Sequence, residues 1–409
     1  MKNVLEWLET TVAKYPDKPA FSDTECSITF AQVYDIARNT GAYLIEQLGV
    51  DRTPVVLKLF VGIAHQVFAG RKMVTPAYFL GVVYAGRPYA PIDASLPDKR
   101  IEKILENLCP RAIVADRESR EHVENIVDEL AKAEGFDRPQ IFIAEDISHF
   151  EQVACADSNC KISESAGDSV TDSENDTDGG VVVSCAGKTD DSSLEKLATV
   201  RRQMSMTDPL YIIYTSGSTG NPKGVMTSHL SLMTYINAYC DVMHIEESDV
   251  LGNQSPLDYI AAIRDIYLPL KTGCSTAIIP KEYFMEPNAL FDYMNEKKVS
   301  SVGWSVSAFT ILTSLGAFEE VGLKSLRKIC FSGSVMPCRV LRKWQENLPE
   351  AHFVNQYGPT EATASCTYYS VDHLVEEDEV LPIGKAYDNY RVFLIDEHGN
   401  EPAVGEQGE

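Results

Sequence analysis

The chain has 409 residues and a formal charge of −24 at pH 7. This length predicts two or three packed units, and a hydrophobic share of 44% indicates a folded protein. So acidic a surface repels nucleic acid and anionic lipid, so we expect neither as a partner. No stretch of about 18 apolar residues is present, so no membrane span is expected.

Ten cysteines are scattered without CxxC pairs or zinc-ligand spacing. Such cysteines are typical of reduced thiols in the cytoplasm. The first residues lack the apolar stretch and cleavage site of a secretory signal. We therefore expect a cytoplasmic protein.

Apolar spacing predicts helices and strands in alternation along the chain. In the first part we expect helices at 3–14, after Ile28, at 78–86 and at 101–108, and strands at 54–60, 90–93 and 111–115. Later we expect strands at 210–214, 275–280, 299–304, 328–332, 352–356 and 390–395, and helices near 229–243 and 287–296. This alternation favours parallel, doubly wound sheets.

Two segments do not fit the alternation. Residues 157–195 are rich in Ser, Asp and Gly, and cannot bury enough apolar surface to offset their ordering entropy. We expect a disordered acidic insert there, with a phosphorylation or partner-binding role as the alternative. Residues 59–73 form an apolar insert that has no chemical interpretation.

Residues 215–224 read TSGSTGNPKG and directly follow an apolar strand. Glycine lets a backbone turn sharply and approach a ligand, while hydroxyls and an ammonium suit a polyphosphate. The residues concerned are Thr215, Ser216, Gly217, Ser218, Thr219, Gly220, Lys223 and Gly224. The segment is not a Walker loop, because Asn-Pro-Lys-Gly follows Gly220. The alternative is a plain Gly/Ser surface loop.

Residues 355–361 read NQYGPTE and follow another apolar strand. The turn at Gly358 puts Tyr357, Thr360 and Glu361 at a strand end, where α/β folds bind ligands. Glu361 could hold Mg²⁺, Thr360 a phosphate oxygen, and Tyr357 a stacked base. By itself, the segment could also be an ordinary turn.

In this order and about 140 residues apart, the two motifs resemble those of the adenylate-forming superfamily. The resemblance is greatest to adenylation domains of nonribosomal peptide synthetases and to D-alanine–carrier-protein ligases. Segments 28–33, 80–93 and 381–384 also resemble family segments. The resemblance implies that 1–409 is an N-terminal adenylation core of doubly wound α/β sheets packed with helices, plus a smaller β-barrel-like subdomain.

The resemblance also implies ATP and Mg²⁺ as cofactors. The implied catalytic residues are Thr215, Lys223, Thr360 and Glu361, with Glu361 as the Mg²⁺ ligand. The implied ATP-binding residues are Thr215, Ser216, Gly217, Ser218, Thr219, Gly220, Lys223, Gly333, Ser334, Asn355, Gln356, Tyr357, Gly358 and Thr360. An acid would form acyl-AMP and pyrophosphate, and then pass to the phosphopantetheine thiol of a peptidyl or acyl carrier protein.

Family members continue beyond the point that corresponds to Glu409. They have a ribose-binding Asp and a small lid domain whose Lys reaches the substrate carboxylate. Neither Lys343 nor Lys385 matches that Lys by context. We therefore expect a fragment without its lid, which binds ATP weakly and turns over slowly.

The acid-binding pocket departs from the family pattern. The matching positions are Asp258, Ile260, Ala261, Arg264, Trp304, Cys330, Ser332, Gln356, Ala364 and Ser365. An ungapped match puts Ile260 where amino-acid-activating members have the Asp that binds the ammonium, and Asp258 reaches that place only through a backbone bulge. Trp304 would shorten the pocket, and Arg264 could meet a second carboxylate. Each position could instead be core packing.

Three functions remain open. The leading one is adenylation of a carboxylic acid, most favourably an amino acid, for a carrier protein in nonribosomal peptide synthesis. The alternatives are an acyl- or aryl-CoA synthetase of the same superfamily and a non-catalytic nucleotide-binding module.

Overall fold

The computed structural model describes residues 2–58, 73–93, 96–148, 191–216 and 220–409. Two compact units are present, an N-terminal unit of 12–204 and a C-terminal unit of 1–11 with 205–409, and each is treated by itself. Insert residues 59–72 and 157–190, and Gly217, Ser218 and Thr219 of the glycine-rich motif, lie outside the described residues. The last residues assigned to the acidic insert, 191–195, begin a helix.

The N-terminal unit has four parallel strands in the order β6-β5-β3-β4. These are β3 (Val55–Lys58), β4 (Tyr89–Pro91), β5 (Ala112–Ala115) and β6 (Gln140–Ile143). The helices are α2 (Phe30–Leu48), α3 (Thr75–Tyr84), α4 (Asp98–Leu108), α5 (Arg120–Leu130), α6 (Ala144–Ser148) and α7 (Asp191–Gln203), and β1 (Pro19–Ser22) pairs with β2 (Ser27–Thr29). The parallel, doubly wound arrangement is thus confirmed here.

Local chemistry explains why α2 begins and packs where it does. Thr29 accepts a hydrogen bond from the backbone N–H of Gln32, whose side chain accepts one from the backbone of Thr29. This capping box satisfies two amides at the helix start. Farther along, α2 meets α3 so closely that a Cβ on Gly81 would lie 2.5 Å from the Cβ of Thr40.

Seven described strands of the C-terminal unit lie in one sheet, in the order β15-β14-β13-β12-β11-β9-β10. The parallel ones are β9 (Val250–Asn253), β10 (Ser275–Ile278), β11 (Ser301–Ser305), β12 (Lys328–Ser332) and β13 (His352–Tyr357), and β14 (Thr367–Ser370) and β15 (Lys385–Ala386) are antiparallel. A hairpin joins β7 (Pro209–Ser216) to β8 (Pro222–Ser228). Helix α1 (Leu5–Lys14) begins in this unit.

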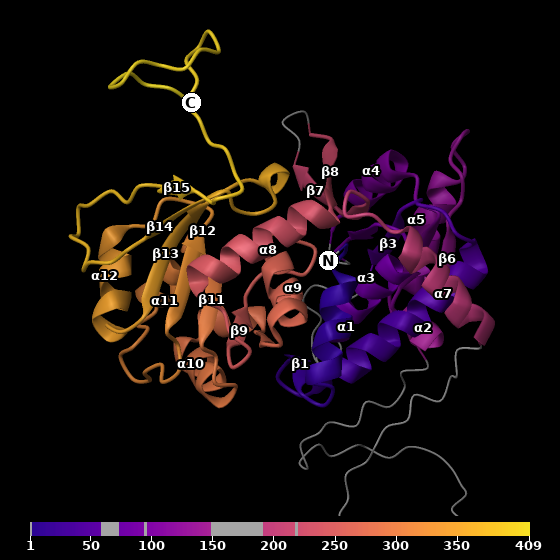
Figure 1. The fold of residues 1–409 in the computed structure, drawn as a ribbon, viewed down its shortest axis with the longest axis horizontal. Coiled ribbons are helices and arrows are strands. Elements are labelled where there is room, and N and C mark those ends of the chain that lie inside the picture. Colours follow the sequence, from indigo (N-terminus) through magenta and orange to yellow (C-terminus); the bar gives the residue numbers. More distant parts are fainter. Residues whose placement is uncertain (1, 59–72, 94–95, 149–190, 217–219) are drawn as a thin grey trace, which may run out of the picture. The chain divides into compact units, whose positions relative to one another are not determined.

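The remaining helices of the C-terminal unit lie on two faces of its sheet. They are α8 (His229–Met243), α9 (Ala262–Thr272), α10 (Pro287–Glu296), α11 (Val306–Ser314) and α12 (Cys338–Asn347), with 3-10 turns η2 (Lys281–Met285) and η3 (Thr360–Ala362). One face of β11–β13 packs into an apolar core with α10, α11 and α12, centred on Trp304, Phe309 and Trp344. The other face meets α8 and α9, and α8 crosses in front of the strands in Figure 1.

Two expectations differ from the structure or stay open. The predicted strand at 390–395 is wrong: these residues form no strand, and Phe393 is 70% exposed. Of this segment, Ile395 pairs with Glu409, through two backbone hydrogen bonds of 2.9 and 2.8 Å. The segment is apolar, as a strand would be, but a strand also needs a neighbouring strand to hydrogen-bond with along its length. No closed barrel is present among the described strands, so the β-barrel-like subdomain stays a prediction.

The sequence predicts that all cysteines are reduced thiols, and for at least one of them this prediction is wrong. Cys26 is disulfide-bonded, a pairing that depends on spatial proximity and that no sequence spacing revealed. Among the described residues, the free cysteines are Cys109, Cys240, Cys274, Cys330, Cys338 and Cys366. None of the described helices is long and apolar enough to cross a bilayer.

Candidate functional site

The carboxyl ends of β12 and β13 form one edge of the C-terminal unit's sheet. Their parallel register places Phe331 opposite Asn355, so both strands end at about the same level. The chain leaves β12 through Gly333 and Ser334, both exposed, and leaves β13 at Tyr357, which is 52% exposed. This is the edge at which open α/β sheets bind ligands.

The loop after β13 has an unusual backbone. A Cβ on Gly358 would lie 2.4 Å from the Cα of Ser365, so no larger residue fits there. Thr363 and Ala364 have φ angles of 56° and 73°, which cost energy for residues other than glycine. Strain of this kind clusters at binding sites, where the surroundings hold a loop in one conformation. The loop presents Glu361 to solvent.

Buried polar contacts hold this loop in place. The amide nitrogen of Asn355 donates to the backbone oxygen of Pro382 at 2.9 Å, and the Tyr390 hydroxyl donates to that of Ala362 at 3.2 Å. Asn355 is only 9% exposed, so its side chain supports the 381–384 segment. Burial raises the pKa of Tyr390 to about 12, so this hydroxyl stays a donor at neutral pH.

The described residues at the two ends of the glycine-rich motif belong to the β7–β8 hairpin. Thr215 is directly opposite Lys223, and Ser216 is opposite Pro222. Gly220 has a φ of +77°, a conformation that glycine adopts without strain. The hairpin thus holds one hydroxyl and one ammonium side by side at the base of the motif.

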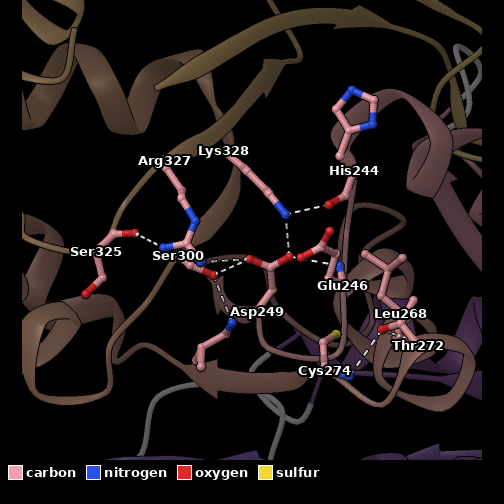
Figure 2. A network of polar contacts seen from close by, with 11 residues as sticks. His244, Glu246, Asp249, Leu268, Thr272, Cys274, Ser300, Ser325, Arg327 and Lys328 are labelled. Carbon is pink, nitrogen blue, oxygen red and sulfur yellow. Dashed lines mark hydrogen bonds and ion pairs between the residues drawn. The ribbon is translucent and has the colours of Figure 1, made fainter. Parts of the chain in front are cut away.

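The opposite edge of the sheet has a different kind of cluster, shown in Figure 2. Asp249 is fully buried and accepts hydrogen bonds from the Ser300 hydroxyl at 2.7 Å, the Lys328 ammonium at 2.6 Å and the Glu246 backbone at 2.9 Å. Burial raises the pKa of Asp249, but these hydrogen bonds outweigh it and leave the pKa below its ordinary value. The cluster joins the amino ends of β9, β11 and β12 and is a structural clamp.

A buried polar layer lies between the sheet and helices α8 and α9. We define it as Tyr235, Tyr239, Arg264, Asp265, Cys330, Gln356 and Tyr387, each at most 4% exposed. At its centre, Arg264 Nε donates to Asp265 Oδ1 at 2.9 Å and Arg264 Nη2 donates to the Gly303 backbone oxygen at 2.5 Å. A Cβ on Gly303 would lie 2.3 Å from Arg264 Cζ, so this guanidinium rests directly on the strand.

The groups of the layer are arranged so that their charges cancel. Asp265 also accepts from Asn253 Nδ2 at 2.9 Å. Burial opposes the charge of Arg264, yet the Asp265 carboxylate holds the pKa of the guanidinium above its usual value. Burial raises the pKa of Cys330 to about 11 and that of Tyr239 well above its ordinary value, so both stay neutral.

Two predicted pocket residues have other roles. The guanidinium of Arg264 is paired with Asp265 through Nε and Nη2, and the expectation that it meets a substrate carboxylate stays a prediction. The expectation that Trp304 lines the pocket is wrong. Its side chain points to the opposite face, where Nε1 donates to the Gly252 oxygen at 2.8 Å. Residues one apart on a strand face opposite ways, so Gly303 and not Trp304 faces the layer.

The other pocket positions are spread over the same end of the unit. Asp258 is half-buried in the turn before α9, and Ile260 is 6% exposed close to the first turn of that helix, with Ala261 after it. Ser332 lies at the end of β12, and the Ser365 hydroxyl donates to Gln356 Oε1 at 3.4 Å. With Ala364 in the strained loop, these assignments stay predictions.

A magnesium ion fits the exposed edge if phosphates share its coordination. The Glu361 carboxylate is exposed, and no described residue pairs with it. Across the described ranges, no group of three or more His, Cys, Asp or Glu could hold a metal alone. Mg²⁺ is usually held by one or two carboxylates together with substrate phosphates, so a single carboxylate suffices.

Sequence reasoning missed Tyr239, Gly303 and Tyr387. Tyr239 lies in an ordinary amphipathic helix and Tyr387 after a short edge strand, so neither carried a signal. Gly303 did carry one, since a glycine inside a strand often marks the close approach of another group.

Comparison with known proteins decides the family. A family model described as "AMP-binding enzyme" matches residues 8–409. The chain belongs to this family. Among the curated proteins that are similar to this AMP-binding enzyme is the D-alanine--D-alanyl carrier protein ligase of Bacillus velezensis, 26% identical over 99% of the chain and 68% of the relative's length. The Bacillus cereus protein of the same name has the same identity and coverage.

Solved structures show the same fold. The chain matches the nonribosomal peptide synthetase FmoA3 with a TM-score of 0.72 and 18% identity, over 97% of this chain and 35% of that one. It matches VinN with a TM-score of 0.71 and 18% identity, over 100% and 88%. The Klebsiella oxytoca NpsA N-terminal subdomain, in complex with 3-hydroxybenzoyl-AMSN, matches with a TM-score of 0.71 and 16% identity, over 100% and 86%. The expected adenylate-forming α/β core is therefore confirmed.

Proposed function

We propose that this AMP-binding enzyme uses ATP to adenylate a carboxylic acid and then delivers the acyl group to a phosphopantetheine thiol on a carrier protein. The observation that carries the proposal is the strained loop after β13, which presents Tyr357 and Glu361 at the carboxyl edge of the sheet. In an AMP-binding chain, an exposed aromatic ring and a free carboxylate suit a base and a phosphate-bound metal.

The residue roles follow from where each side chain lies. Tyr357 would stack on adenine, with Gly333 and Ser334 at the neighbouring strand end. The hairpin pair of Thr215 and Lys223 would bind the β- and γ-phosphates, where an ammonium offsets negative charge. Thr360, Ser216 and Gly220 would add hydroxyl and backbone donors, as would the predicted residues outside the described ranges.

The chemistry requires positioning more than covalent work by the protein. A carboxylate oxygen attacks the α-phosphorus, the bond to the leaving oxygen breaks, and pyrophosphate departs with that electron pair. A bound Mg²⁺ would neutralise charge on the phosphates. Lys223 and the backbone donors would stabilise the charge that develops on the transferred group. In the second step the thiol sulfur replaces AMP at the acyl carbon.

Two observations bear on the acid and its acceptor. Relatives named for D-alanine and a carrier protein favour an amino acid and a carrier-bound thiol over coenzyme A. Against an amino acid, Ile260 is buried and apolar, and the Asp265 carboxylate is already paired. An acid without an amine is therefore the second candidate, and the buried polar layer favours it.

Removal of the Lys223 ammonium tests the proposal. We expect Lys223→Ala to lower acid-dependent ATP–pyrophosphate exchange by about 100- to 1,000-fold, the usual loss for one transition-state donor. The matched control is Lys324→Ala, which removes an exposed ammonium away from the site. Equal exchange in the two variants would contradict the assigned role, and a non-catalytic module would show no acid-dependent exchange at all.

A further inference from the structure

Two buried polar atoms of the layer have no hydrogen-bond partner among the described residues. They are the amide nitrogen of Gln356 and the hydroxyl of Tyr387, in residues that are 3% and 1% exposed. Buried polar groups are almost always satisfied, because a lone one loses its bonds to water and gains nothing. Two such atoms in one layer are therefore open to a ligand or to water.

The two atoms belong to the same side of the sheet. Gln356 is directly opposite Tyr368 in the β13–β14 ladder, and the Tyr368 ring stacks on Tyr387 with centroids 5.1 Å apart. Burial raises the pKa of Tyr387, and the neighbouring Tyr235 hydroxyl and Cys330 thiol act in the same direction. The hydroxyl thus stays protonated and can donate. Gln356 Oε1 is taken by the Ser365 hydroxyl, which leaves the amide nitrogen as a donor.

The layer has no unpaired carboxylate to balance a buried ammonium. Its only carboxylate, Asp265, already accepts from Arg264 and Asn253. The thiol and the tyrosine hydroxyls are neutral, and Arg264 is a fixed positive charge. A second cation beside it would be desolvated without a counter-charge, which is strongly unfavourable.

We propose that Gln356 and Tyr387 are the specificity-determining donors for the acid, and that this acid has a neutral hydrogen-bond acceptor in place of an α-ammonium. A small 2-hydroxy acid has the required chemistry, since its hydroxyl oxygen can accept both bonds. Its bulk is limited by the guanidinium of Arg264, which rests on Gly303. This inference rests on the proposed function, since it names the class of acid that the same site adenylates.

Non-reactive adenylate mimics test the proposal by calorimetry on the 409-residue chain. The probes are 5′-O-(N-lactoylsulfamoyl)adenosine and 5′-O-(N-alanylsulfamoyl)adenosine, which differ only in carrying a hydroxyl or an ammonium on the acyl group. We expect the lactoyl probe to bind at least about tenfold more tightly. Equal or tighter binding of the alanyl probe overturns the inference. Unsubstituted 5′-O-sulfamoyladenosine is the reference: if none of the three binds, the proposed function itself fails.

Two substitutions assign the preference to the named residues. Tyr387→Phe removes one oxygen, and we expect about a tenfold loss for the lactoyl probe only, without a loss of stability. Gln356→Glu supplies a carboxylate, and we expect it to reverse the preference toward the alanyl probe. The control is Tyr293→Phe, whose hydroxyl donates to Ile278 O at 3.1 Å in the opposite core, and it should lower stability and leave both affinities unchanged. If Tyr387→Phe changes neither affinity, the orphan hydroxyl holds a water only and the inference is wrong.

Discussion

The buried pair of Arg264 and Asp265 gives a quantitative prediction for Arg264→Met. Met has a similar length and flexibility, so little cavity should form. The substitution removes the bonds from Arg264 Nε and Nη2 to the carboxylate, at 2.9 and 3.3 Å, and leaves one from Asn253 at 2.9 Å. Breaking a buried pair by removing one partner costs about 3–5 kcal/mol. We expect a loss of that size in the free energy of unfolding.

Tryptophan fluorescence during urea unfolding measures this loss in the correct part of the chain. All three tryptophans, Trp7, Trp304 and Trp344, belong to the C-terminal unit, so the signal reports the unit that contains the pair. The control is the double variant Arg264→Met with Asp265→Leu, because replacing both charges by apolar groups is often neutral. It should recover part of the loss, because the buried charge is gone while the Asn253 amide and the Gly303 oxygen still lose a partner. A single variant that loses under about 1 kcal/mol, or a double variant no better than the single, would refute the reasoning.

Two further predictions concern buried charges elsewhere. The pKa of Asp249 is lower in the folded state than in the unfolded state. The carboxylate therefore contributes its full stabilisation at pH values above its unfolded pKa of about 3.9, and this stabilisation is lost as pH falls through the folded pKa. Asp249→Asn should cost about 1–3 kcal/mol at pH 7 and flatten this acid limb in tryptophan fluorescence, and an unchanged limb would contradict the clamp. In the N-terminal unit, burial lowers the pKa of Lys58, although the carboxylates of Asp98 and Asp116 act to raise it. The Lys58 ammonium contacts His122 Nδ1 at 3.1 Å. Stability there should rise as pH increases through the folded pKa toward about 10.4. Hydrogen-exchange protection factors of the β3 amides, which correct for the base-catalysed rise in intrinsic exchange, should therefore increase with pH over this range in the native chain but not in Lys58→Met.

The sequence was informative where local patterns decide structure. The helix at 287–296 begins with a proline and follows an apolar period, and the strand at 328–332 is a short apolar run, so both were found with their exact bounds. Both motifs that carry chemistry were placed at strand ends, and the structure has Tyr357 at the end of β13 and Thr215 in the final residues of β7.

The sequence was less informative where tertiary contacts decide structure. Whether Gly303 or Trp304 faces the pocket depends on the register of one strand, and a shift by one residue exchanges the two faces. The pairing of Arg264 with its neighbour Asp265 depends on α9 lying against β11, which no periodicity reports. The strand expected at 390–395 is wrong for a related reason, because the residues of a segment do not show whether another strand lies beside it.

The most direct test of the central claim is a single-turnover reaction with labelled ATP, excess protein and a panel of carboxylic acids. Single-turnover conditions detect the adenylation step even where turnover is slow. We predict that label in the α-phosphate appears as acyl-AMP and AMP only when the correct acid is present, with pyrophosphate released in equal amount. Formation of ADP, or AMP formation that no acid in the panel stimulates, would contradict the account.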